Sequence, residues 1–145
     1  MTRVTVGGVL IVMLGIFLGC SETPMQNTNR SSDQNLQNVE FAALENDVMS
    51  LELEEPENPL ELTDEMIERL GQVIEHMRSV QDRFRDFENR SPNEDAKALL
   101  EAVAELRNSA IEAYDAGDFI GSFNAFQDAR EIMRSALEIV RPEGM

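Results

Sequence analysis

The chain has 145 residues, enough for one small domain, and it carries 28 Asp and Glu against 12 Lys and Arg, a formal net charge of −16. Phosphate binding needs clustered Lys and Arg, so this balance argues against nucleic acid as a partner and against a membrane surface recognised through basic patches. The single cysteine excludes a disulfide within the chain.

Residues 1–19 have the layout of a secretory signal, with a positive start, a short apolar core and a small residue at the end. Arg3 is the only charge, and the run VTVGGVLIVMLGIFL at 4–18 is apolar apart from one threonine. These 15 residues are fewer than the roughly 20 that a membrane-spanning helix needs. The sequence therefore predicts a signal peptide over 1–19, with an uncleaved N-terminal anchor helix as the alternative.

The end of this segment, IFLGC at 16–20, resembles the lipobox of bacterial lipoproteins, although Phe17 stands where that family more often has leucine. The resemblance implies that Cys20 carries a diacylglycerol and becomes the first residue of the mature chain. It also implies a lipid-anchored protein on the periplasmic side of a bacterial cell membrane. Ser21 replaces the aspartate that commonly retains such proteins in the inner membrane, which favours the outer membrane of a Gram-negative cell. A multiply acylated cysteine would meet the need of stable anchoring for more than one acyl chain.

The next segment, 20–38, is rich in Asn, Ser, Thr and Gln and has little to bury, so it predicts a disordered tether. An acidic segment follows at 39–62. It predicts a short amphipathic helix that ends before Pro56, and this helix is a candidate fourth member of the bundle described below. Its apolar residues at helical spacing are Val39, Ala43, Leu44, Val48 and Leu51.

Residues 31–68 contain twelve Asp and Glu and no Lys or Arg. We interpret this stretch as a solvated, self-repelling linker. The alternative is a surface for a divalent cation or a basic partner, although the spacing of an EF-hand loop is missing.

Three longer helices are predicted at about 64–88, 92–116 and 118–141. In each of them apolar residues recur at alternating spacings of about three and four, the seam of a helical bundle. The seams are Met66, Leu70, Val73, Met77, Val80, Phe84 and Phe87; Ala96, Leu99, Val103, Leu106, Ala110 and Ala113; and Phe119, Phe123, Phe126, Met133, Leu137 and Val140.

Capping residues set the ends of these helices. Thr63 and Asp118 are expected N-caps, the segment 91–94 (SPNE) is expected to form a capping box that begins at Ser91, and Gly117 is an expected C-cap. Short connections join antiparallel neighbours. We therefore expect an all-α fold, a small antiparallel three-helix bundle over 63–145.

Residues 110–132, AIEAYDAGDFIGSFNAFQDAREI, resemble one tetratricopeptide repeat hairpin. The matching residues are Ala110, Tyr114, Gly117, Asp118, Phe119, Ser122, Phe126 and Ala129. The closing proline of that motif falls at Arg134, and no second copy exists, whereas repeat folds need about three units. The resemblance implies a mode of hairpin packing and not a peptide-binding superhelix.

Few side chains in the chain suit catalysis or ligand binding. His76 is the only histidine, and Val73 stands where a carboxylate-bridged di-iron bundle would need a glutamate, so we interpret His76 as a surface or boundary residue. Arg130 falls on a seam and is expected to reach out to acidic neighbours, with a partner-facing groove as the alternative. Phosphate-loop and nucleophile-elbow motifs are missing. Cys20 is thus the only predicted site residue, and we predict no catalytic, metal-binding or cofactor-binding residue.

These features predict a non-catalytic, membrane-anchored lipoprotein that acts as a protein-interaction or scaffolding module in the bacterial cell envelope. Its partners would be the membrane, through the lipid, and an unidentified protein, but no nucleic acid. The alternative is a small-ligand or metal carrier that uses the bundle interior or the acidic segment.

Overall fold

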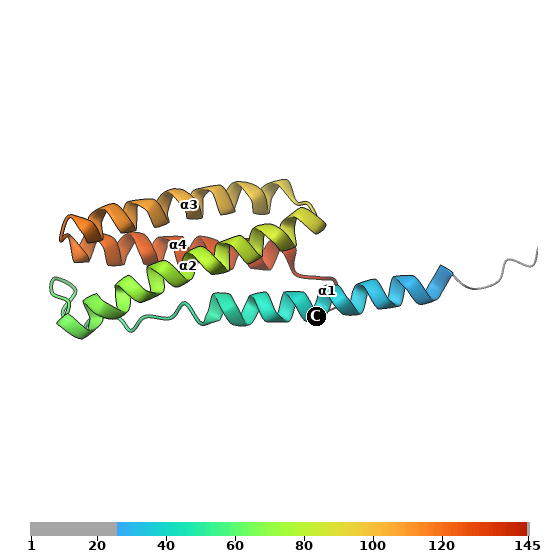
Figure 1. The fold of residues 1–145 in the computed structure, drawn as a ribbon, viewed down its shortest axis with the longest axis horizontal. Coiled ribbons are helices and arrows are strands. Elements are labelled where there is room, and N and C mark those ends of the chain that lie inside the picture. Colours follow the sequence, from blue (N-terminus) through green and yellow to red (C-terminus); the bar gives the residue numbers. More distant parts are fainter. Residues whose placement is uncertain (1–25, 145) are drawn as a thin grey trace, which may run out of the picture.

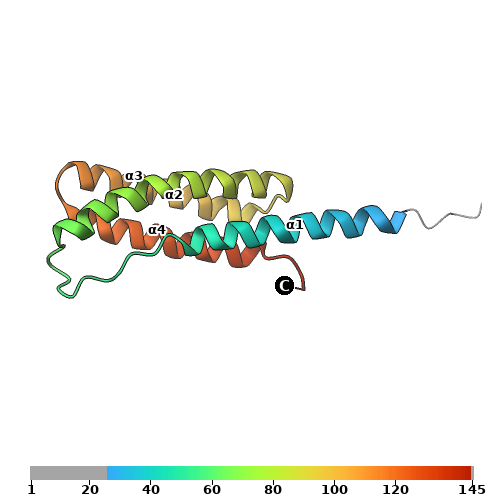
Figure 2. The same ribbon diagram turned by 60° about the horizontal axis from the view of Figure 1, so that its bottom comes forward.

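A computed structural model describes residues 26–144. They form four helices, α1 (Gln26–Met49), α2 (Asp64–Arg90), α3 (Glu94–Asp115) and α4 (Phe119–Val140), and the described part contains no strand. The helices run alternately up and down, and α1 and α3 each lie beside both α2 and α4 (Figures 1 and 2). The expected all-α bundle is confirmed, and the helix of the acidic segment, the candidate fourth member, belongs to it as α1.

Helix α1 departs most from the prediction. It begins at Gln26, inside the segment predicted to be a disordered tether, and its first turns extend past the ends of the other helices (Figures 1 and 2). The physical reason is that no Gly or Pro occurs from 25 to 55. The packed turns from Phe41 onward serve as a nucleus. Each residue added on the N-terminal side of this nucleus then gains one backbone hydrogen bond, so the helix extends in that direction. As predicted, it ends before Pro56.

The buried face of α1 also differs in part from the predicted one. Phe41 is 1% exposed, whereas Val39, which was assigned to the stripe, is 67% exposed. The buried residues of α1, at spacings of three and four, are Phe41, Leu44 and Val48, and Leu51, just after the helix, continues the spacing and is buried too. This heptad stripe fills the face between α2 and α4.

The predicted seams of the other helices agree with the observed core in outline. Val73 and Leu99 are only half-buried, and Ile74 and Leu100 next to them are buried instead. Besides the α1 stripe, the apolar core consists of Leu53, Leu62, Leu70, Ile74, Met77, Val80, Phe84, Phe87, Ala96, Leu100, Val103, Ala110, Phe123, Phe126, Ala129, Met133, Ala136 and Leu137. Each seam is therefore centred on residues that the spacing identified or that adjoin them.

Two predicted N-caps are confirmed, and one is wrong. Thr63 Oγ1 accepts a hydrogen bond from the Met66 amide, and Asp118 Oδ1 accepts one from the Gly121 amide. The N-cap of α3, however, is Asn93, and Ser91 instead ends α2. Asn93 and Ser91 are both good capping types. Asn93 is favoured here because the Glu88 carboxylate accepts a hydrogen bond from its amide at 3.1 Å and holds the loop in place.

Helices α3 and α4 form the tightest hairpin. Gly117 has a φ of +79°, the left-handed conformation that suits glycine after a helix end. Beyond the turn, the buried Ser122 hydroxyl donates a hydrogen bond of 2.7 Å to the Ala110 carbonyl, so the two helices approach closely at small residues. Tyr114 and Phe119 close the turn edge to face, with ring centroids 5.3 Å apart. Within residues 26–144, no helix is both long and apolar enough to cross a lipid bilayer.

Candidate functional site: an arginine-lined groove along α4

Ion pairs at heptad spacing flank the apolar stripe of α1. On the α2 side, Glu40 pairs with Arg90 at 2.5 Å. Seven residues later, Asp47 pairs with Arg83, which precedes Arg90 by seven. The antiparallel register of α1 and α2 therefore matches each acid with one arginine.

A second row of ion pairs joins α1 to α4. Glu45 pairs with Arg141 at 3.2 Å, and Glu52, seven residues later, pairs with Arg134 at 3.2 Å. Arg141 is also 2.8 Å from Glu138 on its own helix. Four acids of the segment that was interpreted as a solvated linker are thus paired with arginines of the same chain.

Arg130 breaks this regular pattern. The nearest carboxylate oxygen, on Glu52, lies 3.8 Å away and already pairs with Arg134. Arg130 donates instead to the side-chain oxygen of Gln127 at 2.9 Å, and its side chain is only 15% exposed. Burial and the neighbouring positive charge of Arg134 lower the pKa of Arg130, which Glu52 and Glu55 partly offset. As predicted, this seam arginine reaches out to acidic neighbours, but two guanidinium groups share one carboxylate there.

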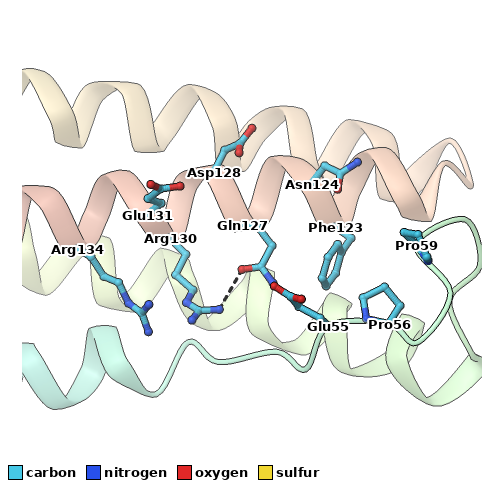
Figure 3. A pocket seen from close by; sticks show the side chains of 10 residues that line it. All are labelled: Glu55, Pro56, Pro59, Phe123, Asn124, Gln127, Asp128, Arg130, Glu131 and Arg134. Carbon is cyan, nitrogen blue, oxygen red and sulfur yellow. Dashed lines mark hydrogen bonds between the residues drawn. The ribbon is translucent and has the colours of Figure 1, made fainter.

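A groove of about 560 Å³ opens beside this pair. One wall is the row of side chains on α4 that face the connector between α1 and α2, and the other wall is the connector itself (Figure 3). The α4 row contains Phe123, Gln127, Arg130 and Arg134, and the connector contributes Glu55, Pro56 and Pro59. The side chains of Asn124, Asp128 and Glu131 turn away from the connector and form the outer rim (Figure 3).

The groove exists because α1 stops short. Met49 is its last residue, and residues 50–63 then cross the remaining half of the α2–α4 face without regular structure. Leu53 and Leu62, near the two ends of this connector, are buried and attach it to the core. Pro59 and Leu60 between them are exposed. An irregular chain is narrower than a helix, so the connector leaves part of the surface between α2 and α4 uncovered. This uncovered part is the groove.

The sequence did not reveal a second polar cluster, which lies in the core. Gln81 is fully buried, donates to the Leu100 carbonyl at 3.0 Å and accepts a hydrogen bond of 2.7 Å from Arg107. Burial, with the charge of nearby Arg78, lowers the pKa of Arg107. Only the place of Gln81 next to the seam residue Val80 hints at its burial. The cluster joins α2 to α3.

The sequence singled out three further positions, Cys20, Ser21 and His76. Cys20 and Ser21 are outside the described residues, as is the whole predicted signal peptide. His76 is exposed, with Nε2 3.2 Å from the Ser50 hydroxyl, which confirms a surface histidine. In the part of the chain that the structure describes, no group of three or more His, Cys, Asp and Glu side chains is arranged to hold a metal ion.

Comparison of the chain with protein families, with curated proteins and with solved structures finds no match. The lipoprotein and tetratricopeptide resemblances therefore stay predictions from the residues alone.

Proposed function

We propose that this protein is a non-catalytic, lipid-anchored interaction module of a bacterial cell envelope. Cys20 is its attachment point, and the groove beside Arg130 is its binding surface for a protein partner. The observation that carries the binding role is the open groove, in which apolar and charged side chains stand next to an arginine pair that shares the Glu52 carboxylate. The motif IFLGC at 16–20 supports the anchor.

The direction of α1 supports this arrangement. A helix of 24 residues is about 36 Å long at 1.5 Å per residue. Its N-terminal end extends past the end of the bundle at which α2 joins α3, and the connector 50–63 lies towards the opposite end (Figure 1). If the lipid anchor precedes α1, the end of the bundle that carries the connector and the groove points away from the membrane. A partner then has access to the groove.

The anchor is tested in a bacterial host. Mass spectrometry of the membrane-extracted protein should find a chain that begins at Cys20 with a diacylglycerol and further acyl mass on the sulfur-bearing residue. The Cys20→Ser variant should lose this mass and leave the detergent-extracted fraction. An unmodified Cys20 in a chain that still carries residues 1–19 would refute the anchor.

The partner role is tested by placing a photo-crosslinking amino acid at Asn124, an exposed position on the rim of the groove. Irradiation of intact membranes should give one discrete adduct. The matched control is the same amino acid at Glu105, an exposed position on α3 that lies outside the groove. Equal adducts from both positions, or none from Asn124, would contradict a partner at the groove.

The carrier alternative has no such support in the described residues. The bundle interior between the helices is filled by side chains that are 0–8% exposed. Metal analysis of the purified protein is the simplest test, and a stoichiometric metal would favour the carrier over the interaction module.

A further inference from the structure

Helix α1 is attached to the bundle by a different kind of contact from those that join the other helices. Buried or half-buried side chains donate hydrogen bonds to backbone carbonyls and so link α2 to α3 and α3 to α4; the donors are Gln81, Tyr114 and Ser122. Between residues 33–49 of α1 and the other three helices, the structure shows no such bond. The carboxylates of α1 pair with arginines whose side chains are partly exposed. Release of α1 therefore exposes apolar surface but breaks no buried hydrogen bond of this kind.

The connection between α1 and α2 also allows α1 to move. Fourteen residues, 50–63, join the two helices, whereas three residues join α2 to α3 and three join α3 to α4. An extended chain of this length spans about 46 Å at 3.3 Å per residue. This span exceeds the length of α1, about 36 Å. Helix α1 can therefore leave its place while α2 stays where it is.

The surface that α1 covers has a distinct chemistry. We call it the α1 face (Figures 1 and 2), and it has an apolar middle and two edges that carry arginines seven residues apart. Its defining residues are Phe87 in the middle, Arg83 and Arg90 on the α2 edge, and Arg134 and Arg141 on the α4 edge. A helix fits this face when it has apolar residues at spacings of three and four and an acid on each side of them at heptad spacing. Helix α1 is one such helix.

The α1 face continues into the groove. Arg134 belongs to both, because it pairs with Glu52 just after α1 and also lines the groove. The last turn of α1 and the groove lie one after the other along α4. A partner bound in the groove is therefore next to the C-terminal end of α1 and to the arginine edge on α4.

We propose that α1 is an exchangeable occupant of the α1 face, and that the protein partner displaces it with an acidic amphipathic helix of its own. The partner helix places its apolar residues against the middle of the face and its acids against the two arginine edges, as α1 does. Until the partner binds, α1 covers the face. This inference rests on the proposed function, because it assumes a protein partner that first contacts the groove.

Competition between α1 and an added helix has a specific signature. The apparent affinity for the added helix equals its intrinsic affinity reduced by the fraction of molecules in which α1 is released. A substitution that weakens α1 in the protein therefore strengthens binding of the added helix, and the same substitution in the added helix weakens it. A substitution on the α1 face acts on both helices and does not separate them, so the variants are placed in α1.

The test uses the full chain in detergent micelles and a fluorescent peptide of residues 33–52, DQNLQNVEFAALENDVMSLE, whose binding is followed by anisotropy near 0.15 M salt. This peptide is the probe because α1 is the helix whose fit to the face is seen in the structure. Phe41→Ala in the protein should tighten binding at least about 10-fold, and Phe41→Leu at least about 2-fold. Phe41→Ala in the peptide should weaken binding at least about 10-fold. The control, Val39→Ala, should change binding less than about 2-fold in either molecule.

The arginine edges are tested through the acids of the peptide. Joint replacement of Glu40 and Glu45 by glutamine and of Asp47 by asparagine should weaken binding at least about 3-fold, because three ion pairs are lost. Asp33→Asn, at an acid that pairs with no arginine in the described part of the chain, should change it less than about 2-fold. Equal effects of the two replacements would overturn the acidic specificity of the face.

The sign of the Phe41 effect decides the exchange. Phe41→Ala with the same sign in protein and peptide, or no binding of the peptide to any variant, would overturn the proposal. If Phe41→Ala does not fold, Phe41→Leu decides. Light scattering covers the other occupant, since a dimer of the full chain that excess peptide dissociates would assign the face to a second copy and overturn the partner helix.

The two proposals fail separately. Absence of peptide binding while the Asn124 adduct persists would refute the exchange and leave the interaction module standing. Opposite signs for Phe41→Ala in protein and peptide, without any adduct in membranes, would refute the interaction module and its partner helix and leave α1 exchangeable.

Discussion

The register of α1 can be tested by comparing Phe41 with Val39, two residues away on the same helix. Phe41 is 1% exposed, and its ring centroid lies 6.1 Å from that of Phe87 at an interplanar angle of 57°. The Arg141 guanidinium carbon lies 5.9 Å from the centre of the same ring. Val39 is 67% exposed. Replacement of each by alanine should therefore have very different effects.

Truncation of a buried phenylalanine to alanine removes its transfer free energy and leaves a cavity, and it typically destabilises by about 3–5 kcal/mol. The Phe41–Phe87 contact places the expected value within this range and not below it. Val39→Ala removes an exposed side chain and should stay within about 0.5 kcal/mol of the unchanged protein. The difference between the two variants should be at least ~2.5 kcal/mol.

Urea unfolding followed by far-ultraviolet circular dichroism measures both free energies of unfolding. A small domain has a total stability of about 5–15 kcal/mol, so Phe41→Ala is expected to be marginal. Phe41→Leu, which keeps most of the volume and should lose no more than ~1.5 kcal/mol, provides a variant that remains folded.

A loss for Val39→Ala that equals or exceeds that for Phe41→Ala would refute this reasoning. Such a result would mean that α1 turns the face with Val39 towards the bundle, as the sequence pattern had predicted. The ion pairs of Glu40 and Glu45 would then also have to be reassigned.

Three further predictions concern the rest of the bundle. Raising the salt from 0.1 to 1 M shortens the Debye length from ~10 to ~3 Å, so the partly exposed Asp47–Arg83 pair should lose its contribution of ~0.2–1 kcal/mol; amide exchange in the middle of α1 should then quicken in the unchanged protein but not in Asp47→Asn. Gly117→Ala should destabilise by about 1–2 kcal/mol, because a φ of +79° strains any residue with a Cβ even though no atom lies within 4 Å; an unchanged melting temperature would contradict this. Gln81→Ala should cost about 1–3 kcal/mol in urea unfolding, because it removes the hydrogen bond from Arg107 Nη1 and the one to the Leu100 carbonyl, and a neutral effect would show that water replaces the amide.

Helices α2, α3 and α4 were predictable because each has a continuous apolar stripe and a capping residue at or near its start. The sequence pattern of α1 was misleading because Val39 and Ala43 share a helical spacing with Leu44, although Phe41 belongs to the buried stripe. The early start at Gln26 is not visible in composition, since a polar segment becomes helical when the packed turns that follow it serve as a nucleus.

The groove was predictable only in part. The position of Arg130 on an otherwise apolar seam was visible in the heptad pattern, and it raised the question of a partner-facing groove. The other wall is an irregular connector, and no periodicity reports where Glu55 and Pro56 cross a helix that lies more than sixty residues further along the chain. The pairing of Glu52 with Arg134 is a long-range contact of the same kind.

The repeating charges on α1 do not by themselves select one alignment of this helix. A slide by one heptad, about 10 Å, would bring Asp33 to the place of Glu40 and Glu40 to the place of Asp47, so acids would still meet both arginines of α2. Among the pairs with α4, only the one at Arg141 would lose its acid, because Asn38 would take the place of Glu45. The same slide would put Gln34 and Gln37 where Phe41 and Leu44 lie. Burying a phenylalanine and a leucine stabilises by about 3–6 kcal/mol together. Gln34 and Gln37, one heptad before Phe41 and Leu44, therefore prevent α1 from sliding by seven residues, because the slide would lose the burial of two apolar side chains while keeping most of the ion pairs.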